Sequence, residues 1–451
     1  MRLFLTARRS LPTLWCLAPR SRSSPTPTWN SKAMTATIII GAGVIGATTA
    51  YFLAREGLSV TVLDSQPEPG METSFANGGL LAANSALPWS SPGTPLQMLK
   101  WLGREDAPLL LRPSAIPALG SWGLKFLANC RDSKYRDTAN TLTRFAQHSL
   151  GLMNTLLERE SLKFDLGRGG FLEIFKGPGA RASAEAFATL LERMGARVSR
   201  LDRLGCVTLE PSLRPIESSI EIGLWLENDC WGDAHKFTRE IARVAAGEGV
   251  RFEYGAEVKG LEVRNAKITG VKLANGRLEA ERVIVCGGAA SAKLLAPWGV
   301  KIPVAPVKGY SLTLDRDEVG IAPTRPIVDD HEHICVTPLG DRLRVAGTVE
   351  FAGNDRTLRE SRVANLKQAL RNLYPQIRMP PEVNAWCGMR PMTVDGLPYI
   401  DATPVENLLV NTGHGALGWT LACASAERIT QLVTGSYAPN VGAFKLYRRV
   451  I

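Results

Sequence analysis

The most regular hydrophobic pattern in the chain covers residues 37–64, TIIIGAGVIGATTAYFLAREGLSVTVLD. A β-branched run at residues 38–40 leads into a glycine-rich turn, after which apolar residues recur at helical spacing to residue 53. A second apolar run, residues 60–63, ends at Asp64. The pattern predicts a strand, a glycine turn, a helix and a second strand.

The turn contains Gly41, Gly43 and Gly46 at the spacing G-x-G-x-x-G. Glycines so spaced allow a tight turn, a close approach of backbone to a pyrophosphate, and close packing of helix on sheet. The helix N-terminus favours the negative pyrophosphate, and Asp64 is placed to accept hydrogen bonds from a ribose diol. We interpret the stretch as a dinucleotide-binding unit. The eighteen uncharged residues 37–54 would also suit a membrane span, but the three glycines argue against it.

The rest of the chain contains both helical and strand patterns. Helical spacing covers residues 119–162, 182–194 and 236–247, and the prolines and tryptophans of residues 88–117 predict a long irregular connection. Strand patterns occur at residues 170–175, 223–226, 250–254, 257–263, 267–273, 282–286, 309–314, 333–337 and 342–346. The strands between residues 250 and 286 predict a return to the nucleotide domain with a small antiparallel meander. The later ones predict a large antiparallel sheet.

Three further segments offer bare backbone to a cofactor. Residues 72–79, ETSFANGG, form a polar, glycine-rich loop, and the apolar strand pattern at residues 283–286 ends in Gly287 and Gly288. Residues 408–420 repeat the opening order of apolar strand, glycine turn and apolar helix. The N-terminus of that helix would be a second positive dipole end at the same sheet edge.

Charge is concentrated at the N-terminus. Residues 1–36 hold six Lys and Arg and no acid, so they supply most of the formal net charge of +10, and we infer no nucleic-acid binding from it. An acid-free, Arg- and Ser-rich leader is typical of an organellar transit peptide, but Met34 would equally suit a misassigned start. The pair Arg8-Arg9 is a weak twin-arginine signal.

Cysteine and histidine usage gives no sign of a metal site. The eight cysteines stand singly, without a C-x-x-C pair, which indicates a reducing compartment. His331 and His333 would lie on one side of a strand, but no third ligand accompanies them. We therefore expect no bound metal.

Taken together, these segments resemble the D-amino-acid dehydrogenase (small subunit type) family of flavoproteins, within the superfamily of D-amino-acid, glycine and sarcosine oxidases. The landmarks follow the family's order and are GAGVIGATTAYFLA, ETSFANGG, PWSSPG with LKWL, KGYSLT, GMRPMTVDGLP and NTGHGALGWT. The resemblance implies non-covalently bound FAD. It also implies oxidative deamination of D-amino acids to 2-oxo acids and ammonia, by hydride transfer from Cα to flavin N5.

The expected fold class is α/β with α+β. A Rossmann-like FAD-binding domain, with a parallel sheet, helices and a small antiparallel meander, would accompany a substrate domain with a large antiparallel sheet. We assign residues 37–85, 231–300 and 386–440 to the FAD-binding domain, residues 86–230 and 301–385 to the substrate domain, and residues 1–36 to the leader.

The resemblance also implies the residues that hold the cofactor. At the second glycine turn, backbone N–H groups and the helix dipole would stabilise negative charge on the reduced flavin, and His414 would order the loop. The implied residues are Gly41, Gly43, Val44, Ile45, Gly46 and Asp64 for the ADP half, Thr73, Ser74 and Gly79 near the phosphates or flavin, Val258 near the adenine, Gly287 on the flavin side, and Gly413, His414, Gly415, Leu417, Gly418, Trp419 and Thr420 at the second turn.

Arg390 is the expected substrate-binding residue, because related amine-oxidising enzymes have an arginine at the like position that holds the substrate carboxylate. A guanidinium matches a carboxylate through two parallel hydrogen bonds. The alternative is an ordinary ion pair with a nearby loop, for example with Asp395. Tyr310 would line the same pocket, or else be packed in the core.

Substrate and electron acceptor stay open at this point. Residues 228–233, 331–333 and 337–338 differ from the family pattern, so a D-proline-like or N-substituted amino acid is an alternative to a simple D-amino acid. The expected acceptor is a quinone or other carrier, with peripheral membrane association at the inner face of the membrane. A cytoplasmic location is expected, or a mitochondrial one if the leader is a transit peptide.

The alternative functions are an O2-using oxidase and a non-catalytic flavin-binding protein. The second glycine turn disfavours a nicotinamide dehydrogenase.

Overall fold

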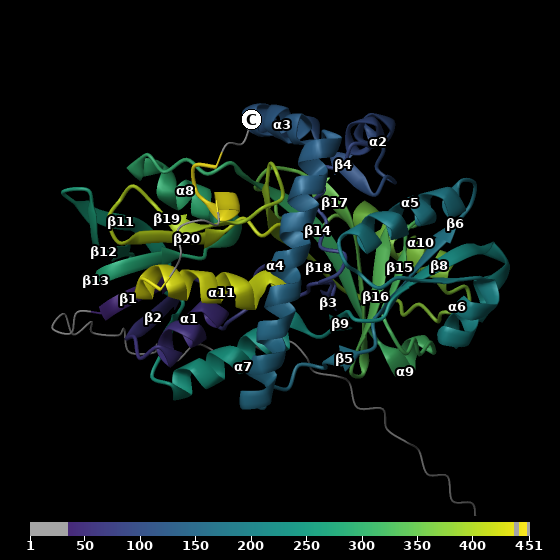
Figure 1. The fold of residues 1–451 in the computed structure, drawn as a ribbon, viewed down its shortest axis with the longest axis horizontal. Helices are drawn as coiled ribbons and strands as arrows, with labels where there is room; N and C mark the ends of the chain where they lie inside the picture. The colour runs from purple at the N-terminus through teal and green to yellow at the C-terminus, as the bar shows by residue number, and fades with distance from the viewer. Residues whose placement is uncertain (1–34, 437–441, 449–451) are drawn as a thin grey trace, which may run out of the picture. The chain divides into compact units, whose positions relative to one another are not determined.

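The structure is a computed structural model that describes residues 35–436 and 442–448. Two large sheets organise these residues, and helices cover them (Figure 1). Residues 1–34 of the expected leader lie outside the described residues, whereas its last two residues, Thr35 and Ala36, belong to the first strand of the fold, so the predicted boundary at residue 36 is wrong. The expected fold class is confirmed by the sheet topology and by the comparisons reported below.

The first sheet has eight strands and contains the predicted nucleotide-binding unit. Its parallel part runs in the order β10 (Arg251–Tyr254), β2 (Val60–Asp64), β1 (Thr35–Ile40), β13 (Gly276–Val285), β20 (Leu408–Thr412). The strands β11 (Val258–Arg264) and β12 (Lys267–Leu273) form an antiparallel meander with β13, and β19 (Tyr399–Ala402) pairs antiparallel with β20. The predicted strand, turn, helix, strand order at residues 37–64 is therefore confirmed.

Four helices bury a common apolar core with this sheet. They are α1 (Val44–Arg55), α4 (Asp132–Arg159), α7 (Ala234–Gly247) and α11 (Gly418–Thr434). The core is dense because small residues alternate with large ones, as in the helix α1, where Ala47 and Ala50 are fully buried beside Leu53. Asp233 caps α7 by accepting hydrogen bonds from the N–H groups of His235 and Lys236.

The second sheet has nine strands and is mostly antiparallel. Along the sheet the order is β18 (Asn384–Thr393), β14 (Val304–Asp315), β17 (Arg342–Phe351), β16 (Ile334–Leu339), β15 (Ile327–Asp329), β6 (Phe171–Lys176), β8 (Ile220–Leu226), β7 (Ser199–Leu201), with β4 (Leu109–Leu111) beside β17. The helices α5 (Ala180–Arg193), α6 (Arg203–Leu209) and α10 (Glu360–Leu373) pack against it, and α9 (Arg316–Val319) follows β14. A small third sheet joins β3 (Leu80–Leu81), β9 (Cys230–Trp231) and β5 (Gly167–Arg168).

Several predicted elements are wrong in detail. Residues 88–117 are not irregular throughout, because α2 (Thr94–Trp101) and β4 form there. Pro95 is compatible with α2, since it occupies the first turn, where a helix does not need its N–H. The helical pattern at residues 119–162 is divided into α3 (Ile116–Asn129) and α4. His331 and His333 lie in the turn between β15 and β16, and His333 has φ of 52°, so their predicted placement on one side of a strand is wrong, although the strand predicted at residues 333–337 forms as β16.

The proposed division into two domains stays a prediction. The described residues, 35–436 and 442–448, form one compact unit, and Asn384–Thr393, part of which is assigned above to the FAD-binding domain, is a strand of the second sheet. Across the described ranges, no helix is both long enough and apolar enough to cross a bilayer. The uncharged residues 37–54 are divided between β1 and α1.

Candidate active site

A cavity of about 1310 Å³ lies where the two sheets face each other. Its floor is the carboxyl edge of the parallel strands, which in open α/β sheets is where ligands bind. The loops that follow β1, β2, β13 and β20 all contribute lining residues, and strands of the second sheet supply the opposite wall. The volume exceeds that of a typical small-molecule pocket, so a dinucleotide and a small substrate can share it.

The first glycine turn has the shape that a dinucleotide needs. Gly41 has φ of 107°, and a Cβ on Gly46 would lie 1.8 Å from the carbonyl oxygen of Gly41, so the helix packs there only with glycine. A Cβ on Gly43 would meet only Ser74 Oγ, at 3.6 Å. Gly43 lines the cavity and leaves its backbone open to an anionic ligand.

Side chains next to the turn are already fixed by hydrogen bonds. The N–H of Val44 donates to Ser74 Oγ at 3.0 Å, and the N–H of Ala42 donates to Asp64 Oδ2 at 2.6 Å. Burial raises the pKa of Asp64, although the N–H groups of Ala42 and Gln66 act in the opposite direction. Asp64 lines the cavity as a fixed acceptor, which fits its expected role toward a ribose.

The second glycine turn is bound to the strand that carries Arg390. The N–H of Gly415 donates to the carbonyl of Pro391 at 3.0 Å, and His414 pairs with Met392 as an isolated bridge. His414 is buried, its Nε2 lies 2.9 Å from Ser425 Oγ, and burial lowers its pKa to about 3. A neutral, buried His414 fits the ordering role that we expected for it.

Most of the expected cofactor residues line this one cavity. The exceptions are Gly46, Gly79 and Gly413, which pack behind the lining: Gly46 against Gly41, Gly79 against Gly232, and Gly413 against Thr393. The residues that line it are Gly41, Gly43, Val44, Ile45, Asp64, Thr73, Ser74, Val258, Gly287, His414, Gly415, Leu417, Gly418, Trp419 and Thr420, together with Arg390 and Tyr310. Their individual roles stay predictions.

Arg390 extends from the middle of β18 into the cavity without an acidic partner. Within the described ranges its guanidinium has no hydrogen bond or ion pair, and its Cζ lies 5.5 Å from the ring centroid of Trp89. Burial lowers the pKa of Arg390 to about 10. Asp395, the expected alternative partner, instead accepts hydrogen bonds from Nε and Nη2 of Arg448 at 2.6 and 2.9 Å. The ion pair between Arg390 and Asp395 is therefore excluded.

Tyr310 lines the cavity, but its O–H is bound within the core. It donates to Glu350 Oε2 at 2.5 Å, and Arg112 Nε donates to Oε1 of the same carboxylate at 2.6 Å. Burial and Glu350 together raise the pKa of Tyr310 far above its ordinary value. The hydroxyl group of Tyr310 is thus packed in the core, as the alternative interpretation expects. Only the ring remains available to contact a substrate.

Sequence reasoning missed several groups around the cavity. Glu173, Asp330 and His333 line it, and burial, with a contribution from Asp330, raises the pKa of Glu173 to about 8. Of the segments that differ from the family pattern, only residue 333 lines the cavity. Trp89 and Gly309 contact Arg390 from segments far away in the sequence. The motif PWSSPG, which contains Trp89, was a signal that could have identified it.

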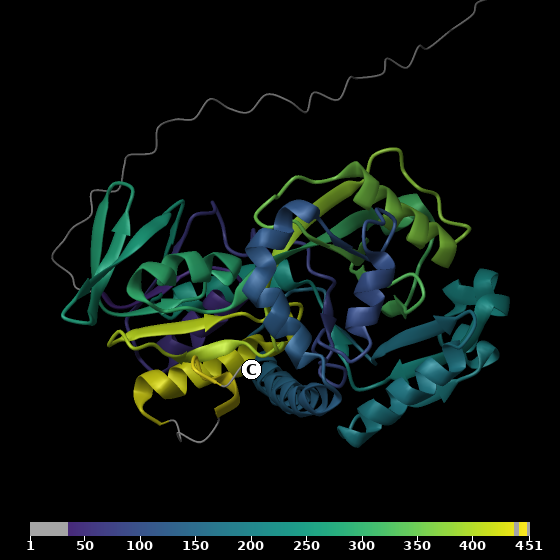
Figure 2. The same ribbon diagram turned by 90° about the horizontal axis from the view of Figure 1, so that it is seen from above.

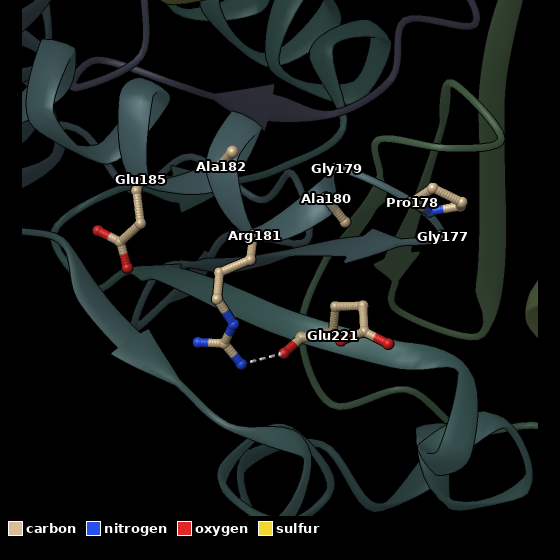
Figure 3. A pocket seen from close by; sticks show the side chains of 8 residues that line it. All are labelled: Gly177, Pro178, Gly179, Ala180, Arg181, Ala182, Glu185 and Glu221. Atoms are coloured by element: carbon tan, nitrogen blue, oxygen red, sulfur yellow. Dashed lines mark hydrogen bonds between the residues drawn. The ribbon is translucent and has the colours of Figure 1, made fainter.

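Other places in the fold offer less chemistry. In the described part of the chain, no three His, Cys, Asp or Glu side chains are arranged to hold a metal ion, and the seven cysteines there are free thiols. A surface hollow lies beside the start of α5 (Figure 3), where Arg181 Nη2 donates to the carbonyl of Glu221 at 3.0 Å. It brings together no set of groups suited to catalysis.

Comparison with known proteins gives a consistent result. The family described as FAD dependent oxidoreductase matches residues 36–432. A D-amino acid dehydrogenase from Xanthobacter autotrophicus is 40% identical over 405 residues, which are 90% of this chain and 96% of that protein. One from Vibrio cholerae serotype O1 is 39% identical over 402 residues, 89% of this chain and 96% of that protein.

Solved structures share the fold at low identity. Glycine oxidase from Bacillus cereus superposes with a TM-score of 0.69 at 22% identity and covers 92% of this chain and 99% of its own. L-proline dehydrogenase from P.horikoshii superposes with a TM-score of 0.69 at 18% identity, over 92% of this chain and 97% of its own. At these identities the likeness concerns the fold alone.

Proposed function

Since the chain belongs to the family of FAD dependent oxidoreductases, we propose that it is a dehydrogenase of D-amino acids. The reaction would convert the Cα–NH₂ group of the substrate to an imine, which water hydrolyses to a 2-oxo acid and ammonia. Relatives named D-amino acid dehydrogenase, at 39–40% identity over about nine tenths of the chain, support this proposal.

Arg390 is the single observation that carries the proposal. A partly buried guanidinium without an acidic partner is costly to maintain unless a ligand supplies the opposite charge. An α-carboxylate supplies that charge and accepts two parallel hydrogen bonds from the planar group. Arg390 shares its cavity with the two glycine turns, so a carboxylate bound there would lie beside the cofactor.

The cofactor is FAD, which supplies the acceptor for two electrons when bound. Gly43, Ser74 and Asp64 would hold its ADP half, and the N–H groups of residues 415–420 would hold its ring end. The chain's own contribution is then orientation and electrostatics. Arg390 fixes the carboxylate, and its positive charge disfavours the ammonium form of the bound substrate. It thereby promotes the neutral amine from which oxidation proceeds.

The spectrum of the purified holoenzyme tests the function. Under anaerobic conditions D-amino acids should bleach the oxidised-flavin absorbance and their L-enantiomers should not. Including D-proline and N-methylated amino acids in the panel distinguishes the substrate alternatives. A flavin that no D-amino acid reduces would contradict the proposal, and would favour a non-catalytic flavin-binding protein if no other amine reduced it either.

Re-oxidation distinguishes a dehydrogenase from an oxidase. Fast recovery of the spectrum with a quinone analogue and slow recovery with air would support the dehydrogenase. Fast recovery with air alone would instead make the chain an oxidase of the same fold.

Replacement of Arg390 tests the site. Arg390→Ala should lower kcat/KM for the best D-amino acid by about 10- to 150-fold, because a hydrogen bond to a charged group contributes about 1.5–3 kcal/mol. Arg371→Ala, at an exposed position of α10, is the matched control. Unchanged efficiency in Arg390→Ala, with FAD still bound, would remove Arg390 from the site.

We further propose that the face formed by α2 and α3 rests on a membrane surface, near the electron carrier. Six large apolar side chains are exposed there, out of eleven in the described residues. We call these the α2–α3 patch: Leu96, Leu99, Leu102, Ile116, Leu124 and Leu127. Both helices lie on one face of the fold, at the top of Figure 1 and toward the viewer in Figure 2. Contiguous exposed apolar surface is typical of membrane or protein contacts.

A further inference from the structure

We propose that Trp89 and Gly309 form a slot that positions the guanidinium of Arg390 for the substrate carboxylate. This inference rests on the proposed function and adds two positioning residues to it. Neither is next to Arg390 in the sequence, and the slot exists only because β14, β18 and the loop before α2 meet.

Trp89 supplies the aromatic side of the slot. The Cζ atom of Arg390 lies 5.5 Å from its ring centroid, within the range in which a cation is attracted to an aromatic face. The ring packs against a buried cluster that includes Trp122 and Met392, and the hydroxyl of Thr94 donates to the carbonyl of Trp89 at 2.8 Å. The ring is therefore held from behind and limits where the guanidinium can move.

Gly309 supplies the backbone side. On β14 it is opposite Gly388 of β18, two positions from Arg390. A Cβ on Gly309 would lie 2.8 Å from Nε of Arg390 and 3.0 Å from its Cζ. No side chain larger than hydrogen fits there without displacing the guanidinium, so glycine at this position preserves the place of Arg390.

A slot of this kind has a chemical advantage over an acidic partner. A neighbouring carboxylate would also hold the arginine, but it would compete with the carboxylate of the substrate for the same N–H groups. The aromatic ring accepts no strong hydrogen bond, Gly309 has no side chain to accept one, and among the described residues no backbone carbonyl accepts one from Arg390, so its five N–H donors stay free for the ligand. The site should therefore select ligands with a free α-carboxylate over their amides.

Ligand binding to the holoenzyme tests the slot. Acetate and its neutral isostere acetamide can be titrated while the flavin absorbance is followed. Trp89→Leu should weaken acetate binding roughly 2- to 30-fold and leave acetamide binding unchanged. Trp89→Phe, which keeps a ring, should recover much of the loss. Gly309→Ala should also weaken acetate selectively, and kcat/KM for a D-amino acid should fall by the same factor in each variant.

Two replacements away from the cavity are the controls. Trp225→Leu removes an indole from β8, and Gly247→Ala adds a Cβ that meets nothing within 4 Å. Both should bind acetate as the wild type does. Flavin content and thermal unfolding identify any variant that does not fold. If Trp89→Leu fails to fold, acetate binding to Trp89→Phe and Gly309→Ala tests the slot in its place.

The outcomes separate the slot from the function beneath it. Normal acetate binding in Trp89→Leu and Gly309→Ala, with weak binding in Arg390→Ala, would overturn the slot and leave the carboxylate site standing. Normal acetate binding in Arg390→Ala would overturn both. Equal losses of acetate and acetamide would mean that Trp89 and Gly309 only stabilise the fold.

Discussion

Asp229 is a buried carboxyl group outside the cavity, and it gives the fold a pH dependence of its own. Its Oδ1 accepts hydrogen bonds from the backbone N–H and the side-chain Nδ2 of Asn84, at 3.0 and 2.8 Å, while its Oδ2 has no partner among the described residues. Burial raises the pKa of Asp229 to about 7, although the bonds from Asn84 partly oppose this. The folded state therefore binds a proton at Asp229 more strongly than the unfolded chain does.

We expect stability to fall as the pH rises from about 4 to about 7, because over this range the unfolded chain releases the Asp229 proton first. Asp229→Asn keeps the site neutral and should flatten this fall. The difference should reach up to about 4 kcal/mol, at about 1.4 kcal/mol for each tenfold change in proton affinity. Thermal unfolding midpoints between pH 4 and pH 8 measure it. The exposed Asp137→Asn is the control, and an unchanged pH profile in Asp229→Asn would contradict the assignment.

Single residues also show where sequence reasoning reaches its limit. Arg390 could be identified because it belongs to a short motif, GMRPMT, with a recognisable place in the chain. The absence of an ion pair between Arg390 and Asp395 could not be predicted, because Arg448 binds that carboxylate from a segment near the C-terminus. Trp89 and Gly309 belong to the motifs PWSSPG and KGYSLT, but neither motif indicates a contact with Arg390, since that contact depends on how distant strands and loops pack.

At the scale of elements, the turn between β1 and α1 assigns different tasks to two of its glycines. A Cβ at residue 46 would overlap the Gly41 carbonyl, at 1.8 Å, whereas one at residue 43 would only approach Ser74 Oγ, at 3.6 Å. Gly46 is thus required by the packing of the helix on the turn. The fold has room for a Cβ at residue 43, so we expect a bound ligand to be what requires glycine there.

Two substitutions separate these tasks. Gly46→Ala should destabilise the apoprotein by about 1–3 kcal/mol or more, as overpacking does, and abolish FAD binding. Gly43→Ala should unfold like the wild type but bind FAD about tenfold or more weakly, a loss of at least about 1.4 kcal/mol. Thermal unfolding of the apoprotein and fluorescence titration with FAD measure both effects. Gly247→Ala is the control, and wild-type FAD affinity in Gly43→Ala would place the pyrophosphate elsewhere.

Elements with regular periodicity could be predicted, and elements specified by their ends could not. The two glycine turns follow apolar strands, so β1, α1, β20 and α11 were evident from the sequence. The boundary between α3 and α4 has neither Gly nor Pro, and it depends on the extended backbone of Arg131, with ψ of 142°. The helix α2 was missed because its proline and tryptophan follow Pro88, Trp89 and Pro92, so that the whole stretch resembles a loop when the helix start is not recognised.

At the scale of the whole molecule, the sequence predicted two sheets but not their mutual position. The cavity exists because the loops of one sheet are bound to the strands of the other. Thr73 Oγ1 donates to the carbonyl of Met389 at 2.7 Å, and the N–H of Gly415 donates to the carbonyl of Pro391. These bonds on either side of Arg390 bring the substrate residue next to both glycine-rich loops, which no periodicity could reveal.

The α2–α3 patch belongs to this scale, because it combines two helices and the charge around them. Residues 94–131 contain five Lys and Arg and two acidic residues, so the exposed apolar side chains lie in a basic setting. An apolar face with basic residues around it favours an anionic bilayer over a neutral one, through apolar burial and attraction to the headgroups. Leu99 and Leu124, at 71% and 72% exposure, are the side chains most open to insertion.

Vesicle flotation of a version that begins at Met34 tests the patch without the basic leader. We expect binding to vesicles that contain phosphatidylglycerol, weaker binding to pure phosphatidylcholine, and release as salt screens the charges. Replacing Leu96, Leu99 and Leu124 with serine should reduce binding at least about tenfold, because each leucine would otherwise bury an apolar side chain worth about 1.5–3 kcal/mol. Leu204→Ser, at an exposed leucine of α6, should change nothing. Equal flotation of the triple variant and the wild type would mean that the patch serves another partner.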